Sequence, residues 1–523
     1  MKKHLLTIAA IIALLALVAV PVFAQGGSEK TAASDAPVTI DLWYGAAITE
    51  AGPPPADWVG FQIIKDKLNI DLKLTALPSN ESDQDVKVQA AGAANNLPDL
   101  FMVRRDAWLR LVQQGLIAPV DDLYEKMPTR TAVQYDEGSR SFTTVNGKSY
   151  GLASPGSIIK NEGVLIRKDW LDKLGLDIPV TLDDYMNVMR AFTYDDPDGN
   201  GKNDTYGYGA FIEINNYEEG LGRRLQPFYG AFGVDGTWSL SKDDPGLNVR
   251  KPAMFDSMVF IKQMIDEGVM DPNWMAYKKD DFRAAWKQGK FGIMREQNAA
   301  FAASANYAPF DKNFPDGEWI VIDPPVGPNG QSSVGPYTTA YRIYAVSNKA
   351  AQAGKKDAIA RLLEWMSSDE GYYLLGWGVE GVNYVKDAAG VPTDAGMELG
   401  FSTPAGQTVT QLRNMVFYNG DIELTARYPK YTTATSGKEM SALEVMRDMQ
   451  SRKWTNNDGA DTLPAPNADV KRFYEQGVLE FLTGRRALTR DNWNAWVAEF
   501  DKIGGKAWED AGIAYATQNG LLK

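Results

Sequence analysis

The stretch LIRKDWLDKLGLDIPVTLDDYMNVMRAFTYDDPDGNGKNDTYGYG, residues 165–209, gives the clearest indication of the fold and of a candidate site. It sets a strand, a helix and an oxygen-rich loop in unbroken succession. A strand followed directly by a helix is typical of α/β proteins. The loop near the end of the stretch has the composition of a cation-binding site.

The loop places four side chains with oxygen donors at alternate positions: Asp196, Asp198, Asn200 and Asp204. In a tightly turning loop these oxygens would point at one centre, and the carbonyl of Lys202 could join them. Such a donor set suits a hard cation, and we predict Ca²⁺. Gly199 and Gly201 allow the backbone to turn tightly, and Pro197 stiffens the entry.

The spacing D-x-D-x-N-G-x-x-D matches the first nine positions of an EF-hand loop. Position twelve is Gly207, however, where an EF-hand carries a bidentate Glu. We therefore do not predict an EF-hand pair. The alternative to a metal site is a solvated Asp/Asn/Gly turn that binds no metal.

The first residues have the pattern of a secretory signal peptide. Two lysines precede an apolar run over residues 5–20, and small residues at Val22 and Ala24 follow it. We predict a signal peptide over residues 1–24, cleaved after Ala24, and a flexible leader over residues 25–37. A retained membrane anchor is the alternative, but the apolar run is short for a bilayer span.

Cysteine is absent, and the only histidine, His4, lies within the predicted signal. Without a lipobox cysteine we expect no lipid anchor, so the protein should be free. Without Cys and His the mature chain cannot form Cys-His or Ser-His-Asp nucleophilic sites, or His- or Cys-based zinc sites. Carboxylate pairs, Ser-Lys dyads and Tyr/Arg lyase chemistry remain open.

The charge and aromatic content indicate the class of partner. The formal net charge is −13, and it becomes −15 when the two lysines of the signal are removed, so nucleic acid is not an expected partner. The 14 Trp and 23 Tyr residues are numerous, and sugar rings bind by laying apolar C–H faces on such side chains. Most of these rings should still lie in the core.

The mature length predicts more than one domain. Strands predicted at residues 38–43, 71–77 and 97–103 alternate with helices at 58–68 and 82–94, which implies parallel sheets and an α/β class. The second half is richer in helices, predicted at residues 253–267, 279–288, 355–376, 440–451, 466–483 and 490–503. Short strands are predicted between them at residues 290–294, 318–322 and 341–347.

Several phrases resemble one known family: LPDLF (97–101), YGLASPG (150–156), IRKDWLDKLGLDIPVTLDDY (166–185), DPDGNGKNDTYG (196–207), KQGKFGIM (287–294), GVEGVNY (378–384) and FLTGRRALTRDNWNAWVAEFDKIGG (481–505). They span most of the mature chain in family order. The chain is similar to the extracellular solute-binding proteins of ABC importers, in the large carbohydrate-binding family 1, and within it to the branch called LplA- or lipo-like.

The resemblance implies a two-lobed periplasmic-binding-protein fold of type II, α/β and helix-rich toward the C-terminus. The first lobe should comprise residues 38–155 plus about 335–395. The second should comprise residues 156–334 plus about 396–523 and carry the calcium loop. The implied function is to capture an oligosaccharide between the lobes and deliver it to a membrane permease without chemistry, as a monomer.

The chain departs from the family pattern at two places. Many relatives carry a lipobox cysteine that is missing here, which favours a free periplasmic protein. Many close the calcium loop with Glu where this chain has Thr205, so we count Thr205 among the candidate ligands and expect a lower affinity for calcium. In relatives with a structural calcium, the loop braces one lobe away from the sugar.

In open α/β sheets, ligands meet the loops just beyond the carboxyl ends of strands. This rule selects candidate ligand contacts at the ends of the predicted strands. We add candidates from a segment expected to cross between the two lobes and from a segment near a predicted helix end. They are Trp43, Tyr44, Arg104, Arg105, Asp106, Ser154, Arg295, Gln297, Tyr337, Trp377 and Glu380. For each residue alone, core packing or solvation is an equally good interpretation.

Two other function classes stay open on the sequence. One is a secreted carbohydrate-active enzyme, either a glycosidase with two carboxylates or a lyase with Tyr and Arg. The other is a carrier for a peptide or another polar solute. A carrier returns its ligand unaltered, whereas an enzyme releases new chain ends.

Overall fold

The computed structural model describes residues 36–47, 51–78, 81–154, 160–212, 222–337, 342–416, 420–457 and 459–523. The chain divides into a unit over Met1–Pro37 and a compact unit over Val38–Lys523, which holds both main sheets. The predicted signal peptide, and the predicted leader up to residue 35, lie outside the described residues. Within the described ranges no helix has the length and apolar composition of a membrane span.

The first sheet has five strands in the order β2-β1-β3-β14-β6. They are β1 (Val38–Tyr44), β2 (Ile70–Ala76), β3 (Leu100–Val103), β6 (Leu152–Ser154) and β14 (Arg342–Val346). β1, β2 and β3 are parallel, and α1 (Val59–Leu68) and α2 (Glu81–Ala93) connect them. β14 is antiparallel to both of its neighbours, β3 and β6. The carboxyl ends of β1, β2, β3 and β6 therefore share one edge.

The second sheet has four strands in the order β12-β7-β11-β8. They are β7 (Glu162–Arg167), β8 (Tyr206–Gly209), β11 (Phe291–Gln297) and β12 (Trp319–Ile322). β8 and β11 are parallel, whereas β7 runs antiparallel to both β11 and β12. The carboxyl ends of β8, β11 and β12 therefore lie at the same edge as the first residue of β7, Glu162.

The prediction of parallel sheets is wrong for one strand in each sheet, β14 and β7. Each is the first strand of its sheet that the chain enters after leaving the other sheet. A helical crossover fixes the direction of the next strand only when both strands belong to one sheet. The alternation of strands and helices along the sequence could not show where the chain changes sheets.

The stretch at residues 165–209 forms the predicted strand and loop, but it has two helices where one was predicted. After β7 the chain forms α7 (Lys168–Leu174), which ends at Gly175 in the left-handed conformation with φ 66°. α8 (Leu182–Tyr194) begins with a capping box: Thr181 Oγ1 accepts from the Asp184 N–H, and the Asp184 carboxylate accepts from the Thr181 N–H. The oxygen-rich loop then joins α8 to β8.

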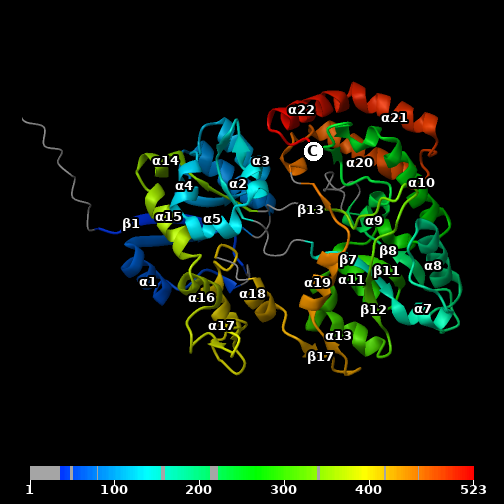
Figure 1. Ribbon diagram of the computed structural model, residues 1–523, viewed down its shortest axis with the longest axis horizontal. Helices are drawn as coiled ribbons and strands as arrows, with labels where there is room; N and C mark the ends of the chain where they lie inside the picture. The colour runs from blue at the N-terminus through cyan, green and yellow to red at the C-terminus, as the bar shows by residue number, and fades with distance from the viewer. Residues whose placement is uncertain are drawn as a thin grey trace, which may run out of the picture. The chain divides into compact units, whose positions relative to one another are not determined.

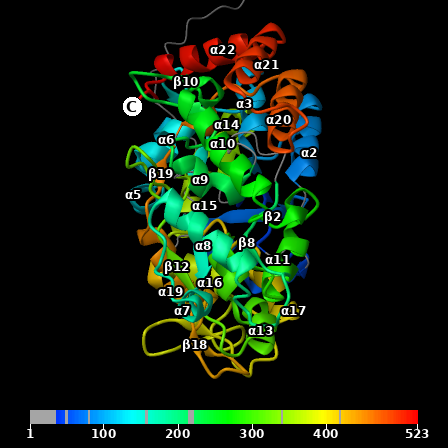
Figure 2. The ribbon, with the colours of Figure 1, turned by 90° about the vertical axis from the view of Figure 1, so that its right-hand side faces the viewer.

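Three C-terminal helices and α10 pack together on the second core. α10 (Pro252–Asp266), α20 (Ala468–Leu482), α21 (Arg490–Lys502) and α22 (Gly505–Gln518) form one group, seen from two sides in Figures 1 and 2. Trp493 and Trp496 in α21 are buried against Phe481, with ring centroids 5.1 and 5.5 Å away. Their burial agrees with the expectation that most of the aromatic rings lie in the core.

Most predicted helices are found within two residues of their expected ends. One exception is the helix predicted over residues 355–376, which is broken into α15 (Lys356–Trp365) and α16 (Asp369–Trp377). The break is at Ser368, whose hydroxyl accepts a hydrogen bond from the Gly371 N–H and caps α16. Some helices were not predicted from the sequence at all, among them α3 (Arg105–Gln113), α13 (Ser304–Asn313) and α22.

The remaining elements connect or cover the two sheets. Before β7 these are α3 (Arg105–Gln113), α4 (Asp121–Lys126), α5 (Pro128–Gln134), α6 (Glu137–Phe142), β4 (Thr144–Val145) and β5 (Lys148–Ser149). Between β8 and β14 they are η3 (Arg223–Leu225), α9 (Gln226–Gly230), β9 (Trp238–Ser239), β10 (Gly246–Leu247), η4 (Asn248–Arg250), η5 (Pro272–Met275), α11 (Lys279–Lys287), α12 (Asn298–Ala302), α13 (Ser304–Asn313) and β13 (Pro336–Tyr337). After β14 they are α14 (Asn348–Gln352), β15 (Val385–Lys386), β16 (Pro392–Thr393), α17 (Pro404–Gln407), η6 (Thr408–Thr410), α18 (Gly420–Arg427), β17 (Tyr431–Thr432), β18 (Glu439–Met440), α19 (Ala442–Ser451), β19 (Thr455–Asn456) and η7 (Ala460–Thr462).

Each sheet has its own hydrophobic core. The core of the first sheet takes buried residues from 40–153, 343–384 and 412–416. The core on the second sheet takes them from 164–322 and 463–516, and a smaller aromatic core around Trp286 lies on the same sheet. Long stretches of sequence thus alternate between two separate cores.

Candidate functional site

The candidate ligand contacts from the N-terminal part of the chain lie near the edge of the first sheet where β1, β3 and β6 end, as the rule on strand ends predicts. Trp43 pairs with Thr75 of β2 and Phe101 of β3, so its position in the sheet is central. Its ring is half-buried, and the ammonium of Lys87 lies 4.7 Å from the ring centroid. Tyr44, the last residue of β1, is fully buried in the first core instead.

Three more candidates lie at the start of α3, just beyond β3. Arg104 precedes the helix, and its guanidinium lies 3.7 Å from the carboxylate of Asp85. Arg105 stacks on the Trp108 ring at 4.2 Å and donates a 3.2 Å hydrogen bond to the Tyr515 hydroxyl of α22. Asp106 is within α3, and its side chain lies outside what the structure describes.

Ser154 is the last residue of β6 and pairs with Arg342, the first residue of β14. Its backbone therefore shares the edge with Trp43 and Arg104, although its side chain is outside the described part of the chain. The predicted residues Trp43, Arg104, Arg105, Asp106 and Ser154 are thus brought to one edge by β1, β3 and β6.

The edge of the second sheet carries a buried charge cluster. Gln297, at the end of β11, pairs with Glu162, at the start of β7. The Glu162 carboxylate lies 3.4 to 3.6 Å from the guanidinium groups of Arg295, Arg224 and Arg223. Burial disfavours the charged carboxylate, but the three arginines outweigh it and lower the pKa of Glu162 to about 2.

A second carboxylate extends this cluster. Glu296 is fully buried, 3.2 Å from Arg224 and 3.1 Å from Arg283. Arg224 also donates a 2.6 Å hydrogen bond to the carbonyl of Arg295, which ties η3 to β11. The sequence selected Arg295 and Gln297 but missed Glu162, Arg224 and Glu296, because only the sheet pairing shows that β7 begins at this edge.

Two aromatic side chains stand beside the charge cluster. The rings of Tyr337 and Trp454 are 6.4 Å apart and nearly perpendicular, because β13 and β19 pair in parallel. The Lys160 ammonium lies 4.2 Å from the Tyr337 ring, and the Arg295 guanidinium lies 5.7 Å from the Trp454 ring. Both rings are half-buried. Tyr337 was predicted, whereas Trp454 was missed, although its neighbours Arg452 and Lys453 could have drawn attention to it.

The last two candidates lie away from these edges. Trp377, at the end of α16, is fully buried in the first core, where Arg413 and Phe401 pack on its ring at 4.3 and 4.9 Å. Glu380 is exposed and lies 3.5 Å from the ammonium of Lys386. The structure therefore does not bring Trp377 or Glu380 together with the other predicted residues.

The oxygen-rich loop folds around Asn200. The side-chain nitrogen of Asn200 donates to the carboxylates of Asp198 (2.8 Å) and Asp204 (3.0 Å). The N–H groups of Asn200 and Gly201 both donate to the Asp196 carboxylate at 3.0 Å. Burial, and then the charges of the neighbouring carboxylates, raise the pKa of Asp198. The loop thus gathers carboxylates that repel one another.

The other two predicted ligands differ in position. Lys202 stays in the turn, where its N–H donates to Asn200 Oδ1 at 2.8 Å. Thr205 is buried, and its hydroxyl donates to the Phe192 carbonyl at 2.9 Å. Among the described residues, no three His, Cys, Asp or Glu side chains are grouped closely enough to hold a metal ion.

The comparison with known proteins begins with a family model. The model of the bacterial extracellular solute-binding proteins matches residues 62–373 of the chain. The chain is 27% identical to the polygalacturonan/rhamnogalacturonan-binding protein YtcQ of Bacillus subtilis, over 69% of this chain and 70% of that protein. It is 26% identical to the fructooligosaccharide ABC transporter substrate-binding protein FusA of Streptococcus pneumoniae, over 53% of this chain and 48% of that protein.

Solved structures show the same fold. FusA in complex with kestose superposes with a TM-score of 0.62 at 19% identity, over 93% of this chain and 100% of that chain. The alginate-binding protein AlgQ2 without calcium ion gives 0.63 at 17% identity, over 92% and 98%. An EF-hand mutant of FusA in complex with fructo-nystose gives 0.60 at 18% identity, over 92% and 98%. The predicted two-lobed α/β fold of type II is confirmed by these neighbours.

Proposed function

Because the chain belongs to the family of bacterial extracellular solute-binding proteins, we propose that it is the substrate-binding component of an ABC importer. It captures an oligosaccharide between two lobes and delivers it to a membrane permease without chemistry. YtcQ is named as a polygalacturonan/rhamnogalacturonan-binding protein and FusA as a fructooligosaccharide-binding one. Both named ligands are carbohydrates, which supports an oligosaccharide as the ligand of this chain. Both relatives are binding proteins, which favours this function over an enzyme or a carrier of another polar solute.

The two lobes correspond to the two cores. The first lobe takes residues 38–155 and the segment from about 335, and it extends to about residue 416 because Leu412, Met415 and Val416 pack in the first core. This end lies beyond the expected limit near residue 395. The second lobe takes residues 156–334 and the rest of the C-terminal part, including the oxygen-rich loop.

The observation that carries the proposal is the aromatic pair of Tyr337 and Trp454 beside Arg295. Two half-buried rings in different orientations offer faces for the C–H surfaces of sugar rings, and the Lys160 ammonium supplies donors for hydroxyl groups. Arg295, which is 3% exposed, lies against the Trp454 ring and pairs with Glu162 beside the two rings. This arrangement lies at the carboxyl edge of the second sheet, where α/β sheets bind ligands.

The first lobe would contribute contacts from its own strand-end edge. These are Trp43, Arg104, Arg105, Asp106 and Ser154, with Gln297 from the second sheet. Tyr44 and Trp377 are left out of the proposed contacts because both side chains are fully buried in the first core. Glu380 is also left out, since it lies apart from these edges.

A carrier function without chemistry fits the state of Glu162. A glycosidase needs a carboxylic acid whose pKa is raised so that it can protonate the leaving group. Glu162 sits at the proposed ligand site, yet its arginine neighbours lower its pKa to about 2. It is therefore a fixed negative charge that orients arginines, unsuited to serve as a general acid.

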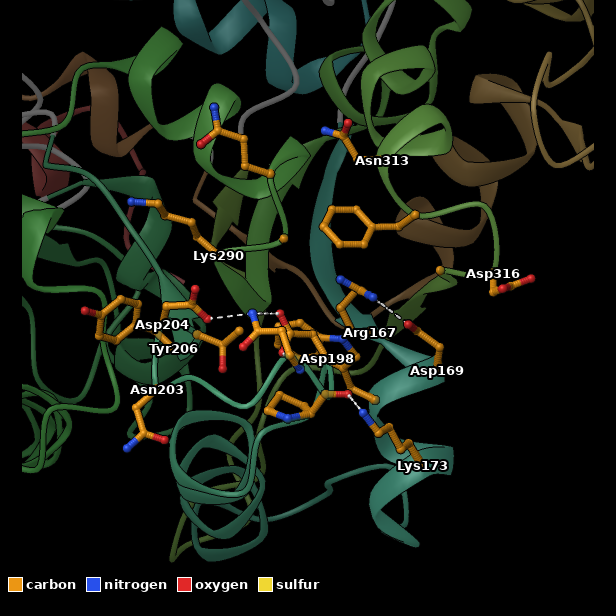
Figure 3. Close-up of a pocket in the computed structure, with 18 of the residues that line it drawn as sticks. Arg167, Asp169, Lys173, Asp198, Asn203, Asp204, Tyr206, Lys290, Asn313 and Asp316 are labelled. Carbon is orange, nitrogen blue, oxygen red and sulfur yellow. Dashed lines mark hydrogen bonds and ion pairs between the residues drawn. The ribbon is translucent and has the colours of Figure 1, made fainter.

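We further propose that the oxygen-rich loop binds a structural calcium. Asp196, Asp198, Asn200 and Asp204 would hold the ion together with the Lys202 carbonyl. The Asn200 amide would have to flip, so that its oxygen faces the ion where its nitrogen now faces the carboxylates of Asp198 and Asp204 (Figure 3). Burial, and then the charges of the neighbouring carboxylates, raise the pKa of Asp198, and a bound cation would favour its charged form against both effects. The hydroxyl of Thr205 donates a hydrogen bond to the Phe192 carbonyl instead, so Thr205 fits least well among the predicted calcium ligands.

The family is extracellular, and we propose export to the periplasm by the signal over residues 1–24, without lipidation. The protein would act there as a monomer that docks on the transmembrane subunits of its permease.

The function is tested by thermal unfolding of the purified mature protein with a panel of neutral and acidic oligosaccharides. A ligand at 100 times its Kd adds about 2.7 kcal/mol of stability. A shift with one class of sugar, and unchanged sugar recovered afterwards, would support the carrier function. No shift with any sugar would refute the oligosaccharide assignment, and a shift with cleavage would indicate an enzyme.

A further inference from the structure

Two lysines at the proposed transport site lie beside aromatic rings that face the ligand. At the edge of the first sheet, the Lys87 ammonium lies 4.7 Å from the centroid of the Trp43 ring. At the edge of the second sheet, the Lys160 ammonium lies 4.2 Å from the centroid of the Tyr337 ring. All four side chains are half-buried. The site therefore offers an aromatic ring together with an ammonium at two places.

Lys87 is held at the ligand edge by the end of β2. It belongs to α2, and its ammonium donates a 3.3 Å hydrogen bond to the carbonyl of Ala76, the last residue of β2. Ala76 pairs with Tyr44, so Trp43 lies one residue before the end of the neighbouring strand β1. Trp43 and Lys87 thus meet where β1 and β2 end, which is where α/β sheets meet their ligands.

The two ammoniums lack a negative partner. Among the residues that the structure describes, neither lies within 4.0 Å of a carboxylate oxygen. The carboxylate of Asp85, on the same helix as Lys87, lies 3.7 Å from Arg104 instead. Glu162, two residues after Lys160, lies 3.4 to 3.6 Å from three arginines. The nearby carboxylates thus pair with arginines, and a lysine ammonium, which has three donors, keeps some of them for a ligand.

This arrangement indicates the charge of the ligand. When the lobes close over a ligand, both ammoniums lose water, and a charge that leaves water is costly unless an opposite charge faces it. The hydroxyl groups of a neutral sugar are uncharged acceptors, whereas hydrogen bonds to a carboxylate are roughly twice as strong. The carboxylate of a uronic acid is attached at the edge of its ring. A uronate that lays its C–H face on Trp43 or Tyr337 can therefore direct its carboxylate at the neighbouring ammonium.

We propose that the transported ligand is an acidic oligosaccharide, and that Lys87 and Lys160 bind the carboxylates of two of its uronate units. Trp43 and Tyr337 bind the C–H faces of the same two units. The inference rests on the proposed function, because it concerns the ligand of that same site. It adds Lys87 to the ligand contacts of the first lobe.

The test compares ligands that share their sugar rings and differ in charge. The mature protein is titrated calorimetrically with acidic trisaccharides built on galacturonate, mannuronate and glucuronate, and with the neutral methyl ester of each. Maltotriose and kestose are included as sugars without a uronic acid. All samples contain the same calcium concentration, because carboxylate oxygens also bind calcium. At least one acidic sugar should bind about tenfold more tightly than its own ester.

Substitutions of the two lysines then locate the recognition of charge. Lys87→Gln and Lys160→Gln should each weaken binding of the acidic sugar about tenfold, and binding of its ester much less. Lys87→Arg keeps the charge and should retain most of the affinity. Lys65→Gln is the matched control, because this exposed lysine lies near the end of α1, at the edge of the first sheet where β2 begins. Circular dichroism of every variant checks that it is folded.

Two results would overturn the proposal and leave the carrier function intact. One is an ester or a neutral sugar that binds as tightly as the best acidic sugar. The other is an unchanged affinity for the acidic sugar in both Lys87→Gln and Lys160→Gln. Raising sodium chloride from about 50 to about 500 mM is an independent check, since screening should weaken binding of the acidic sugar only. If no sugar of either class binds the folded protein, the carrier function itself fails, and the proposal fails with it.

Discussion

Glu162 and Arg295 lie 3.4 Å apart at the edge of the second sheet, and both side chains are almost completely buried. Glu162 opens β7, and Arg295 is near the end of the antiparallel strand β11, so the pair joins two central strands of the sheet. A buried carboxylate shared among three arginines fixes their positions next to Tyr337 and Trp454.

Glu162→Gln should destabilise the protein by about 3 kcal/mol, because it leaves the buried arginines without the carboxylate that compensates them. Urea denaturation of both proteins measures the loss. Glu380→Gln is the matched control, since Glu380 is exposed and pairs with Lys386 at the surface, and its change should stay within about 0.5 kcal/mol. Equal effects of the two variants would contradict a stabilising role for Glu162.

The same carboxylate should make stability depend on acid. Its pKa in the folded protein is about 2, below the ordinary value of 4.5, so the unfolded chain binds the proton more readily. The contribution is complete above pH 4.5 and is lost as the pH falls toward 2; it amounts to about 3 kcal/mol. Denaturation at a series of pH values should show a flatter acid limb for Glu162→Gln than for the wild type. Parallel limbs would rule this out.

Trp454→Ala and Tyr337→Ala should each weaken binding of the transported oligosaccharide about tenfold, since each removes roughly 1.4 kcal/mol of contact with the sugar. Calorimetric titration gives the two affinities. Trp365→Ala is a suitable control, because this half-buried ring of α15 lies outside the proposed site. Unchanged affinity in both variants would place the ligand elsewhere.

Calcium should stabilise the protein without changing its affinity for sugar. Calcium at 100 times its Kd should add about 2.7 kcal/mol to the wild type, and much less to Asp198→Asn or Asp204→Asn. Asp195→Asn, one residue before the loop ligands, is the control. Scanning calorimetry with and without EGTA measures the effect. A wild type insensitive to EGTA would favour the metal-free turn.

Expression in a bacterium with two membranes should give a periplasmic protein that begins at Gln25. Intact-mass spectrometry of the protein from osmotic shock fluid determines both the first residue and the absence of a lipid. Recovery only from the membrane fraction would instead support a retained anchor.

Local patterns in the sequence predicted local structure well. The helices depend on neighbouring residues, and most of the predicted ones were found within two residues of their expected ends. The strand-end rule also placed Trp43, Arg104 and Ser154 at one edge, because it needs only the positions of strands.

Contacts between distant segments could not be predicted from the sequence. The partners of Arg295 come from residues 162 and 223–224, which are brought to it by the reversed strand β7 and by η3. Trp377 looked like a cleft residue because glycine follows it, yet Arg413 and Phe401 cover its ring. Neither the direction of β7 nor the cover over Trp377 is encoded within a short window of sequence.

The hydrogen bond between Arg105 and Tyr515 joins helices that are 410 residues apart in the sequence and that pack on different cores. Any separation of the two cores would have to break it, so this contact is a natural place to attach a fluorescent reporter. The chain contains no cysteine, so a single cysteine introduced at Tyr515 could be labelled without background. The fold thus provides the basis for a reagentless optical sensor of its own ligand.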